Sequence, residues 1–218
     1  MKPKINLQGS ILVANPSVTG DSKGAVILIF SHSLGIVQGV CINKPHPTYD
    51  QLFLMEHLGF KLKDPLRLVD QPVFLSGNDK IHQGIVIHDK EPDAYQASNT
   101  INKDICLTLS NDVLIDIAAG DNTPSNYLIA IGRYSWSAND LLKLIKYGRY
   151  FLLNFDFDIA MRIPYDKKYA YCYEKLGFNP NQLSSSNMVN FDDITTLDPN
   201  LEKLYWIEHK EKEFPNEH

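Results

Sequence analysis

Long apolar runs are missing from this sequence of 218 residues. The longer ones, such as residues 25–30, fall far short of the roughly 20 residues that a transmembrane helix requires. Residues 1–6 also lack the apolar segment and the cleavage site of a secretory signal. We therefore expect a protein without a membrane span that works in the cytoplasm.

Cysteine is scarce, and its spacing excludes two kinds of scaffold. Cys41, Cys106 and Cys172 are an odd number, lie far apart and form no C-x-x-C motif. This pattern excludes a disulfide framework and favours reduced thiols. The five histidines between residues 32 and 88 show none of the i, i+2 or i, i+4 spacings of metal ligands. We therefore expect neither a metal site nor a cofactor.

Catalytic signatures are also missing. We recognise no nucleophile elbow, phosphate-binding loop, dinucleotide-binding glycine motif, zinc-protease motif or calcium-binding loop. The leading hypothesis is a non-catalytic protein that binds a small polar ligand or another protein and has a regulatory role. A site assembled from distant loops leaves no local motif. The second hypothesis is therefore an enzyme that uses Lys44, His88 or Cys41 as acid, base or nucleophile.

Arginine is scarce, and the charge is unevenly distributed. Only four residues are Arg, and the net charge of −5 falls entirely on residues 192–218, which hold eight acids and three lysines. Nucleic-acid binding draws much of its affinity from Lys and Arg beside phosphates, so this charge distribution disfavours it. A nucleic-acid-binding transcriptional regulator is therefore only the third hypothesis.

We expect a domain over residues 1–187 and an acidic tail over 188–218 that contains a short amphipathic helix.

Short strand patterns with single helices between them make up most of the chain. Residues 25–30 and 36–43 are rich in Val and Ile and predict a β-hairpin. Pro45 and Pro47 would end its second strand. Strand spacings are irregular along the chain, which excludes a doubly wound or TIM-barrel repeat. We predict an α+β domain, a layered α/β arrangement with a mixed, largely antiparallel sheet flanked by helices.

Two helix starts have local signals. Thr48 and Gln51 have the spacing of a capping box, which predicts a short helix after Thr48. Ser137 followed by Asp140 predicts another helix, with Ser137 as its N-cap.

Two predicted strand ends carry the polar groups that we select as a candidate site. Asn43 and Lys44 present an amide and an ammonium at one end. Ser76 and Gly77 lie at another, where glycine permits close approach of the backbone. If the sheet brings the two ends together, they offer hydrogen-bond donors to a polar or anionic ligand. The alternative is that these residues only end the strands and form turns, without binding a ligand. His88 closes a third strand and is a further candidate.

Six segments, taken in order, resemble the AlgH/YqgE family of bacterial proteins. The family has no established biochemical function, although its members are often labelled transcriptional regulators. The resemblance runs from about residue 8 to residue 186 and implies a compact, cytoplasmic α/β protein with a mixed sheet and no agreed catalytic residues. The segments are LVANP (12–16), GVCINKP (39–45), PVFLSG (72–77), GIVIH (84–88), TLSNDVL (108–114) and IAIGRYSW (129–136).

The chain departs from the usual family pattern at three places. Ser76-Gly77-Asn78 stands where the family usually has Gly-Gly-Pro, and His82-Gln83 stands before Gly84 in place of Arg. The segment 139–142 reads Asn-Asp-Leu-Leu where the family usually has Gly-Gln-Leu-Glu. A carboxylate is therefore lost at Leu142, and Asp140 introduces another two positions earlier. Ligand contacts made by those family residues are therefore not carried over to this chain.

Overall fold

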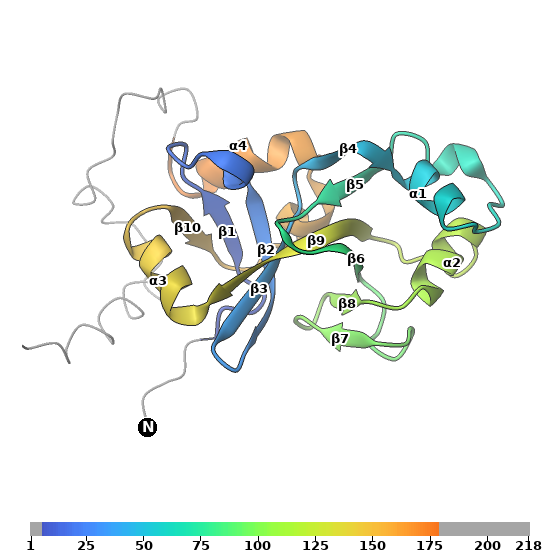
Figure 1. The fold of residues 1–218 in the computed structure, drawn as a ribbon, viewed down its shortest axis with the longest axis horizontal. Coiled ribbons are helices and arrows are strands. Elements are labelled where there is room, and N and C mark those ends of the chain that lie inside the picture. The colour runs from blue at the N-terminus through green and yellow to red at the C-terminus, as the bar shows by residue number, and fades with distance from the viewer. Residues whose placement is uncertain (1–5, 179–218) are drawn as a thin grey trace, which may run out of the picture.

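Runs rich in Val, Ile and Leu form a ten-stranded sheet in the computed structural model, which describes residues 6–178 (Figure 1). The strands are β1 (Ile11–Ala14), β2 (Val26–Ser33), β3 (Ile36–Cys41), β4 (Pro45–Asp50), β5 (Pro72–Leu75), β6 (Asp79–His88), β7 (Ser98–Thr100), β8 (Cys106–Thr108), β9 (Tyr127–Ser137) and β10 (Tyr150–Leu153). The α-helices are α1 (Gln51–His57), α2 (Asp112–Ala119), α3 (Ala138–Lys146) and α4 (Tyr165–Lys175). Short 3-10 turns at Gly20–Ser22 and Pro65–Arg67 and a π-helix at Asp158–Arg162 complete the described elements.

The sheet is mixed and mainly antiparallel. Its strands lie in the order β10-β1-β2-β3-β9-β6-β8-β7, with β5 beside β9 and β4 beside β5. Among the described strands, the pairing of β5 with β9 is parallel and every other pairing is antiparallel. The predicted α+β fold with a mixed, largely antiparallel sheet is thus confirmed.

Strand β9 joins the two halves of the sheet. Its first part, residues 127–131, pairs with β5 and β6, and its last part, residues 134–137, pairs with β3. Between the two parts, Gly132 has a φ of +77°, a left-handed conformation that glycine adopts without steric cost. Figure 1 shows β9 passing through the middle of the molecule with one half of the sheet on each side.

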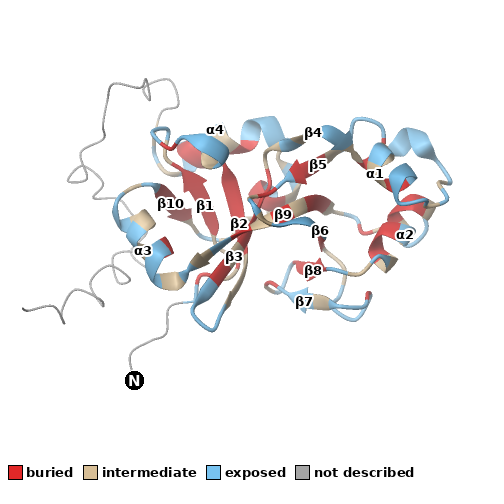
Figure 2. Ribbon diagram, viewed as in Figure 1, coloured by how far each residue is buried: buried red, intermediate tan, exposed pale blue. Residues whose placement is uncertain are grey.

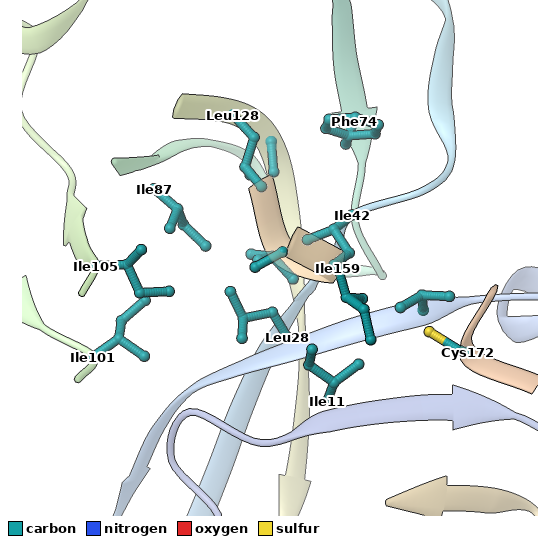
Figure 3. Close-up of a cluster of buried hydrophobic side chains, with 14 of the residues drawn as sticks. Ile11, Leu28, Ile42, Phe74, Ile87, Ile101, Ile105, Leu128, Ile159 and Cys172 are labelled. Atoms are coloured by element: carbon teal, nitrogen blue, oxygen red, sulfur yellow. The ribbon is translucent and has the colours of Figure 1, made fainter. Parts of the chain in front are cut away.

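The central hydrophobic cluster connects both halves of the sheet (Figure 3). Ile11 and Leu28 from β1 and β2 gather with Ile87 and Leu128 from β6 and β9, and Ile159 of the π-helix joins them. Ile11, Leu28, Ile87 and Ile159 have no exposed surface. Removal of most of one such side chain costs about 2–5 kcal/mol of stability, so the two halves support each other.

Two further clusters place the helices. Successive residues of a strand point to opposite faces, so Leu12 and Ala14 of β1 lie on the opposite face from Ile11 and pack in a cluster with Leu141 of α3. A third cluster holds α1 and α2 against β5, β6 and β9, with Met55 fully buried. Figure 2 shows the result, in which strand interiors are buried and the helices expose their outer faces.

One predicted boundary is wrong. The second hairpin strand ends at Cys41, and Pro45 and Pro47, predicted to terminate that strand, lie inside a strand of their own, β4. Of the described strands, β4 pairs only with β5, so it has a free edge on which the missing N–H of proline costs no ladder hydrogen bond. The predicted domain end at 187 and the helix predicted within 188–218 lie outside the described residues.

The two predicted helix starts have different outcomes. Thr48 does not cap α1, because the Asp50 carboxylate accepts the hydrogen bond from the Phe53 N–H at 2.7 Å. Ser137 does cap α3, and its Oγ accepts from the Asp140 N–H at 3.1 Å. The Ser137 hydroxyl also donates to the Asp140 carboxylate at 2.7 Å.

Candidate functional site

The ends of β3 and β5 meet beside the bend of β9, as the site selected from the sequence requires. The Cys41 N–H donates to Ser76 Oγ at 2.8 Å, and the Leu75 N–H donates to the Lys44 carbonyl at 2.9 Å. On the other side, the Ser76 N–H donates to the Ile131 carbonyl at 2.9 Å. We call residues 41–44, 75–77 and 131–134 the strand corner.

Gly77 allows two backbone segments, residues 76–77 and residues 132–133, to approach each other closely. A Cβ at Gly77 would lie 2.3 Å from the Arg133 carbonyl oxygen, and a Cβ at Gly132 would lie 2.6 Å from the Ser76 carbonyl oxygen. The φ of Gly77 is +63°, which side chains rarely allow. A salt bridge of 2.9 Å from Arg133 to Asp79 spans the same crossing. Ser76 and Gly77 therefore join the two halves of the sheet, and the fully buried Ser76 hydroxyl is committed to that role.

Asn43 secures the start of β2. Its Oδ1 accepts from the Val26 N–H at 2.8 Å and from Cys41 Sγ at 3.2 Å, and its Nδ2 donates to the Gly24 carbonyl at 2.9 Å. Because both ends of the amide are engaged, Asn43 has a structural task in addition to any contact with a ligand.

Lys44 is the charged side chain of the strand corner that has no carboxylate partner among the described residues. Its Nζ donates to the Asp21 carbonyl at 2.6 Å, and the Tyr134 hydroxyl donates to the same carbonyl at 3.1 Å. The side chain is half-buried, and within residues 6–178 it forms no ion pair with a carboxylate. A carbonyl leaves the positive charge unneutralised, so the ammonium can attract an anion.

The loop over residues 20–24 carries a nucleophile-elbow pattern, contrary to the expectation from the sequence that the chain has none. It reads Gly-Asp-Ser-Lys-Gly and so fits the G-x-S-x-G pattern of a nucleophile elbow. An elbow lies between a strand and a helix, whereas this loop connects the antiparallel strands β1 and β2. The Asp21 carbonyl of this loop accepts hydrogen bonds from Lys44 Nζ and from the Tyr134 hydroxyl. The loop therefore contributes a backbone acceptor to the surroundings of Lys44, and its position between two strands is not that of a nucleophile elbow.

Cys41 is a buried thiol in this corner. Burial raises its pKa, and the hydrogen bond with Asn43 and the charge of Lys44 oppose that shift only in part. The pKa of Cys106 is raised by burial as well, and burial raises the pKa of Cys172 to about 12. Because the thiolate is the nucleophilic form, burial and the raised pKa both disfavour nucleophilic chemistry at these three cysteines.

His88 does not join the corner. It pairs with Tyr127 of β9, four residues before Ile131, which is roughly 13 Å along a strand. The imidazole is fully buried, with Nε2 2.7 Å from Thr108 Oγ1 and Nδ1 accepting from the Lys90 N–H at 3.2 Å. Burial lowers its pKa. His88 is thus a neutral imidazole that links β6 to β8 and to the loop after β6.

The departures from the family pattern occupy different environments. Asn78 and His82 are exposed on the surface, and Gln83 is half-buried. The carboxylate of Asp140 belongs to the cap of α3, and Leu142 packs beside the cluster under that helix. The substitutions in this helix therefore contribute to its start and its packing.

Two features are absent from residues 6–178. This part of the chain has no cluster of three or more His, Cys, Asp or Glu side chains able to hold a metal ion. Among its helices, none combines the length and the apolar character needed to cross a bilayer.

The comparison with known sequences identifies one family. The family model described as AlgH-like matches residues 11–181. A UPF0301 protein of Ralstonia nicotianae is 30% identical over 182 residues, which cover 83% of this chain and 93% of the relative. A UPF0301 protein of Haemophilus influenzae is 26% identical over 176 residues, which cover 81% of this chain and 94% of the relative.

Two solved structures share the fold. The solution structure of AlgH from Pseudomonas aeruginosa matches with a TM-score of 0.67 at 23% identity, covering 86% of this chain and 98% of AlgH. The crystal structure of protein DIP2367 from Corynebacterium diphtheriae matches with a TM-score of 0.58 at 15% identity, covering 80% of this chain and 90% of the other. At these identities the likeness concerns the fold alone.

Proposed function

The chain belongs to the AlgH-like family, and on that premise we propose that it acts in the cytoplasm by binding, without catalysis of its own, and with a regulatory consequence. The ligand that we propose is a small anionic or polar molecule held at Lys44, at the edge of the strand corner.

The state of the candidate reactive groups supports binding over catalysis. Cys41 is buried with a raised pKa, and His88 is buried, neutral and hydrogen-bonded to Thr108. The Ser76 hydroxyl is fully buried and accepts the Cys41 N–H. A nucleophile or a base must reach its substrate, and each of these groups is engaged with the protein itself.

The unneutralised charge of Lys44 is the observation that carries the proposed ligand site. Its ammonium, which has three N–H donors, donates to the neutral Asp21 carbonyl. The Tyr134 hydroxyl, which donates to the same carbonyl, is its polar neighbour. A charge-assisted hydrogen bond to an anion is roughly twice as strong as a neutral one, so an anionic ligand has an energetic reason to bind at this ammonium.

Native mass spectrometry of the protein purified gently from its own host tests this proposal. We expect a retained adduct of defined mass on the wild-type protein and its loss in Lys44→Met. The matched control is Lys23→Met, which removes an exposed lysine from the same loop and should leave the adduct in place.

Three results would contradict the proposal. The first is a wild-type protein that carries no adduct, and the second is an adduct that Lys23→Met and Lys44→Met remove equally. The third is a reproducible turnover activity that disappears in Lys44→Ala, because that would make the site catalytic. Circular dichroism of each variant verifies that the fold is intact.

A further inference from the structure

Two hydrogen-bond donors from different parts of the sheet converge on a single backbone oxygen. Lys44, in the connection between β3 and β4, places its Nζ 2.6 Å from the Asp21 carbonyl oxygen, and the Tyr134 hydroxyl of β9 lies 3.1 Å from the same oxygen. One donor is a cation, and the other is a phenol that keeps its proton because burial raises its pKa. The two donors form a preformed site for one oxygen atom, and the chain itself supplies that oxygen.

The Asp21 carbonyl belongs to a loop whose side chains are not packed into the protein. Residues 19–23 lie between β1 and β2, and none of them is buried. The chain is fixed on both sides of this loop, because Val18 before it is buried and the Gly24 carbonyl after it accepts from Asn43 Nδ2 at 2.9 Å. The two donors, and not burial of the loop, therefore hold the carbonyl in place.

A glycine in a left-handed conformation lies near each end of this loop. The φ of Gly20 is +69° and that of Gly24 is +67°, and a Cβ at either residue would have no neighbour within 4 Å. The space around both residues admits a side chain, so the backbone conformation is what favours glycine there. Because glycine adopts positive and negative φ with similar ease, the loop has a pivot near each end.

We propose that the Asp21 carbonyl occupies the position of an oxyanion, a carboxylate or phosphate group of the ligand, and that residues 19–23 move aside when this ligand binds. This inference rests on the function proposed above and adds the chemical class of the ligand and its competition with the loop. The carbonyl carries only a partial charge, whereas an oxyanion adds the attraction between two full charges. Because the closed loop occupies both donors, the apparent affinity is set by the fraction of molecules in which the loop is open.

NMR titrations of the full-length protein with inorganic phosphate and, separately, with acetate at constant ionic strength test the inference. The carbonyl carbon of Asp21 and the amide of Ser22 belong to one peptide group, so their chemical shifts report on the two hydrogen bonds directly. We expect a saturable change in both shifts with phosphate, with acetate or with both, and no saturable change in Lys44→Met. The probe that binds identifies the ligand group as a phosphate or a carboxylate.

Backbone strain at Gly20 tests the competition between loop and ligand. Alanine in the left-handed conformation destabilises the closed loop, and opening relieves that strain. Gly20→Ala should therefore tighten the binding of the probe by about fivefold. Gly20→Asn should tighten it less, because asparagine tolerates this conformation. The matched control is Gly59→Ala, at a left-handed glycine outside this loop with a φ of +73°, which should leave the affinity unchanged.

The inference is overturned if neither probe binds, or if a probe binds without a change in the Asp21 carbonyl shift. It is also overturned if Gly20→Ala fails to tighten binding, or if Gly59→Ala tightens it equally. An adduct that is lost in Lys44→Met and kept in Lys23→Met would still support the proposed ligand site in native mass spectrometry. Failure of this inference and failure of the proposed function are therefore distinguishable.

Discussion

Substitution of Gly77 by alanine tests how closely the two halves of the sheet must approach. The added Cβ would lie 2.3 Å from the Arg133 carbonyl oxygen and 2.6 Å from the carbon of that carbonyl. Both backbones are fixed at this point, because the Ser76 N–H donates to the Ile131 carbonyl and Gly132 has its own close contact with Ser76. The overlap can therefore be relieved only by movement of the strands.

Two costs add up in this variant. A left-handed φ of +63° costs alanine about 1 kcal/mol relative to glycine. Displacement of packed backbone to relieve the overlap costs about 1–3 kcal/mol more, by analogy with overpacked cores. We expect Gly77→Ala to lower the free energy of unfolding by about 3 kcal/mol. In a domain of this size, that corresponds to a fall in Tm of about 6–12 °C.

Urea unfolding followed by circular dichroism, together with two control variants, separates these costs. Gly59 has a φ of +73°, and a Cβ added there would have no neighbour within 4 Å, so Gly59→Ala measures the cost of the backbone conformation alone. Gly84 has neither a left-handed φ nor a close neighbour, so Gly84→Ala should be nearly neutral. The reasoning is refuted if Gly77→Ala destabilises the protein no more than Gly59→Ala does.

Three further predictions concern buried groups. Ser76→Ala should lower the free energy of unfolding by about 1–3 kcal/mol in urea titrations, because it leaves the buried Cys41 N–H without its acceptor; an unchanged midpoint would contradict this. A maleimide should label none of the three native cysteines until the protein is unfolded, and rapid labelling of any one would support the enzyme hypothesis. Lys168 is buried, donates to two carbonyls and has its pKa lowered by burial from 10.5 to about 8. Between these two pH values the unfolded chain binds more protons than the folded chain, so the stability of the folded state rises with pH. The free energy of unfolding of the wild type relative to that of Lys168→Met should increase by about 3 kcal/mol from pH 7.5 to 10.5. If this difference in free energy does not change with pH, the lowered pKa of Lys168 is refuted.

The elements with local signals were predictable from the sequence. The serine cap of α3 needs only Ser137 and the N–H three residues later, and both lie in one short segment. The hairpin of β2 and β3 likewise follows from two apolar runs with a short connection. In contrast, the prolines of β4 are compatible with a strand only because that strand lies at an edge, and an edge is a property of the whole sheet.

The residues of the candidate site could be selected from the sequence, but the way in which the fold brings them together could not. Asn43, Lys44, Ser76 and Gly77 were selected as two strand ends, and their meeting depends on β5 lying parallel to β9 while β3 pairs with the far end of the same strand. No local sequence pattern predicts that one strand, here β9, pairs with strands of both halves of the sheet. His88 was selected for the same reason as the others, and the register of β6 places it elsewhere.

The close crossing of backbones at the strand corner decides which residue can report on function. Ser76 and Gly77 hold the two halves of the sheet together, so substitutions there are expected to change stability together with any binding at the strand corner. Lys44 differs because its side chain is only half-buried and its ammonium donates to a loop carbonyl. Loss of that single neutral-acceptor contact costs the fold little compared with the crossing itself. A change in binding on substitution of Lys44 can therefore be attributed to the proposed ligand site, so Lys44 is the residue at which the binding and enzyme hypotheses are to be distinguished.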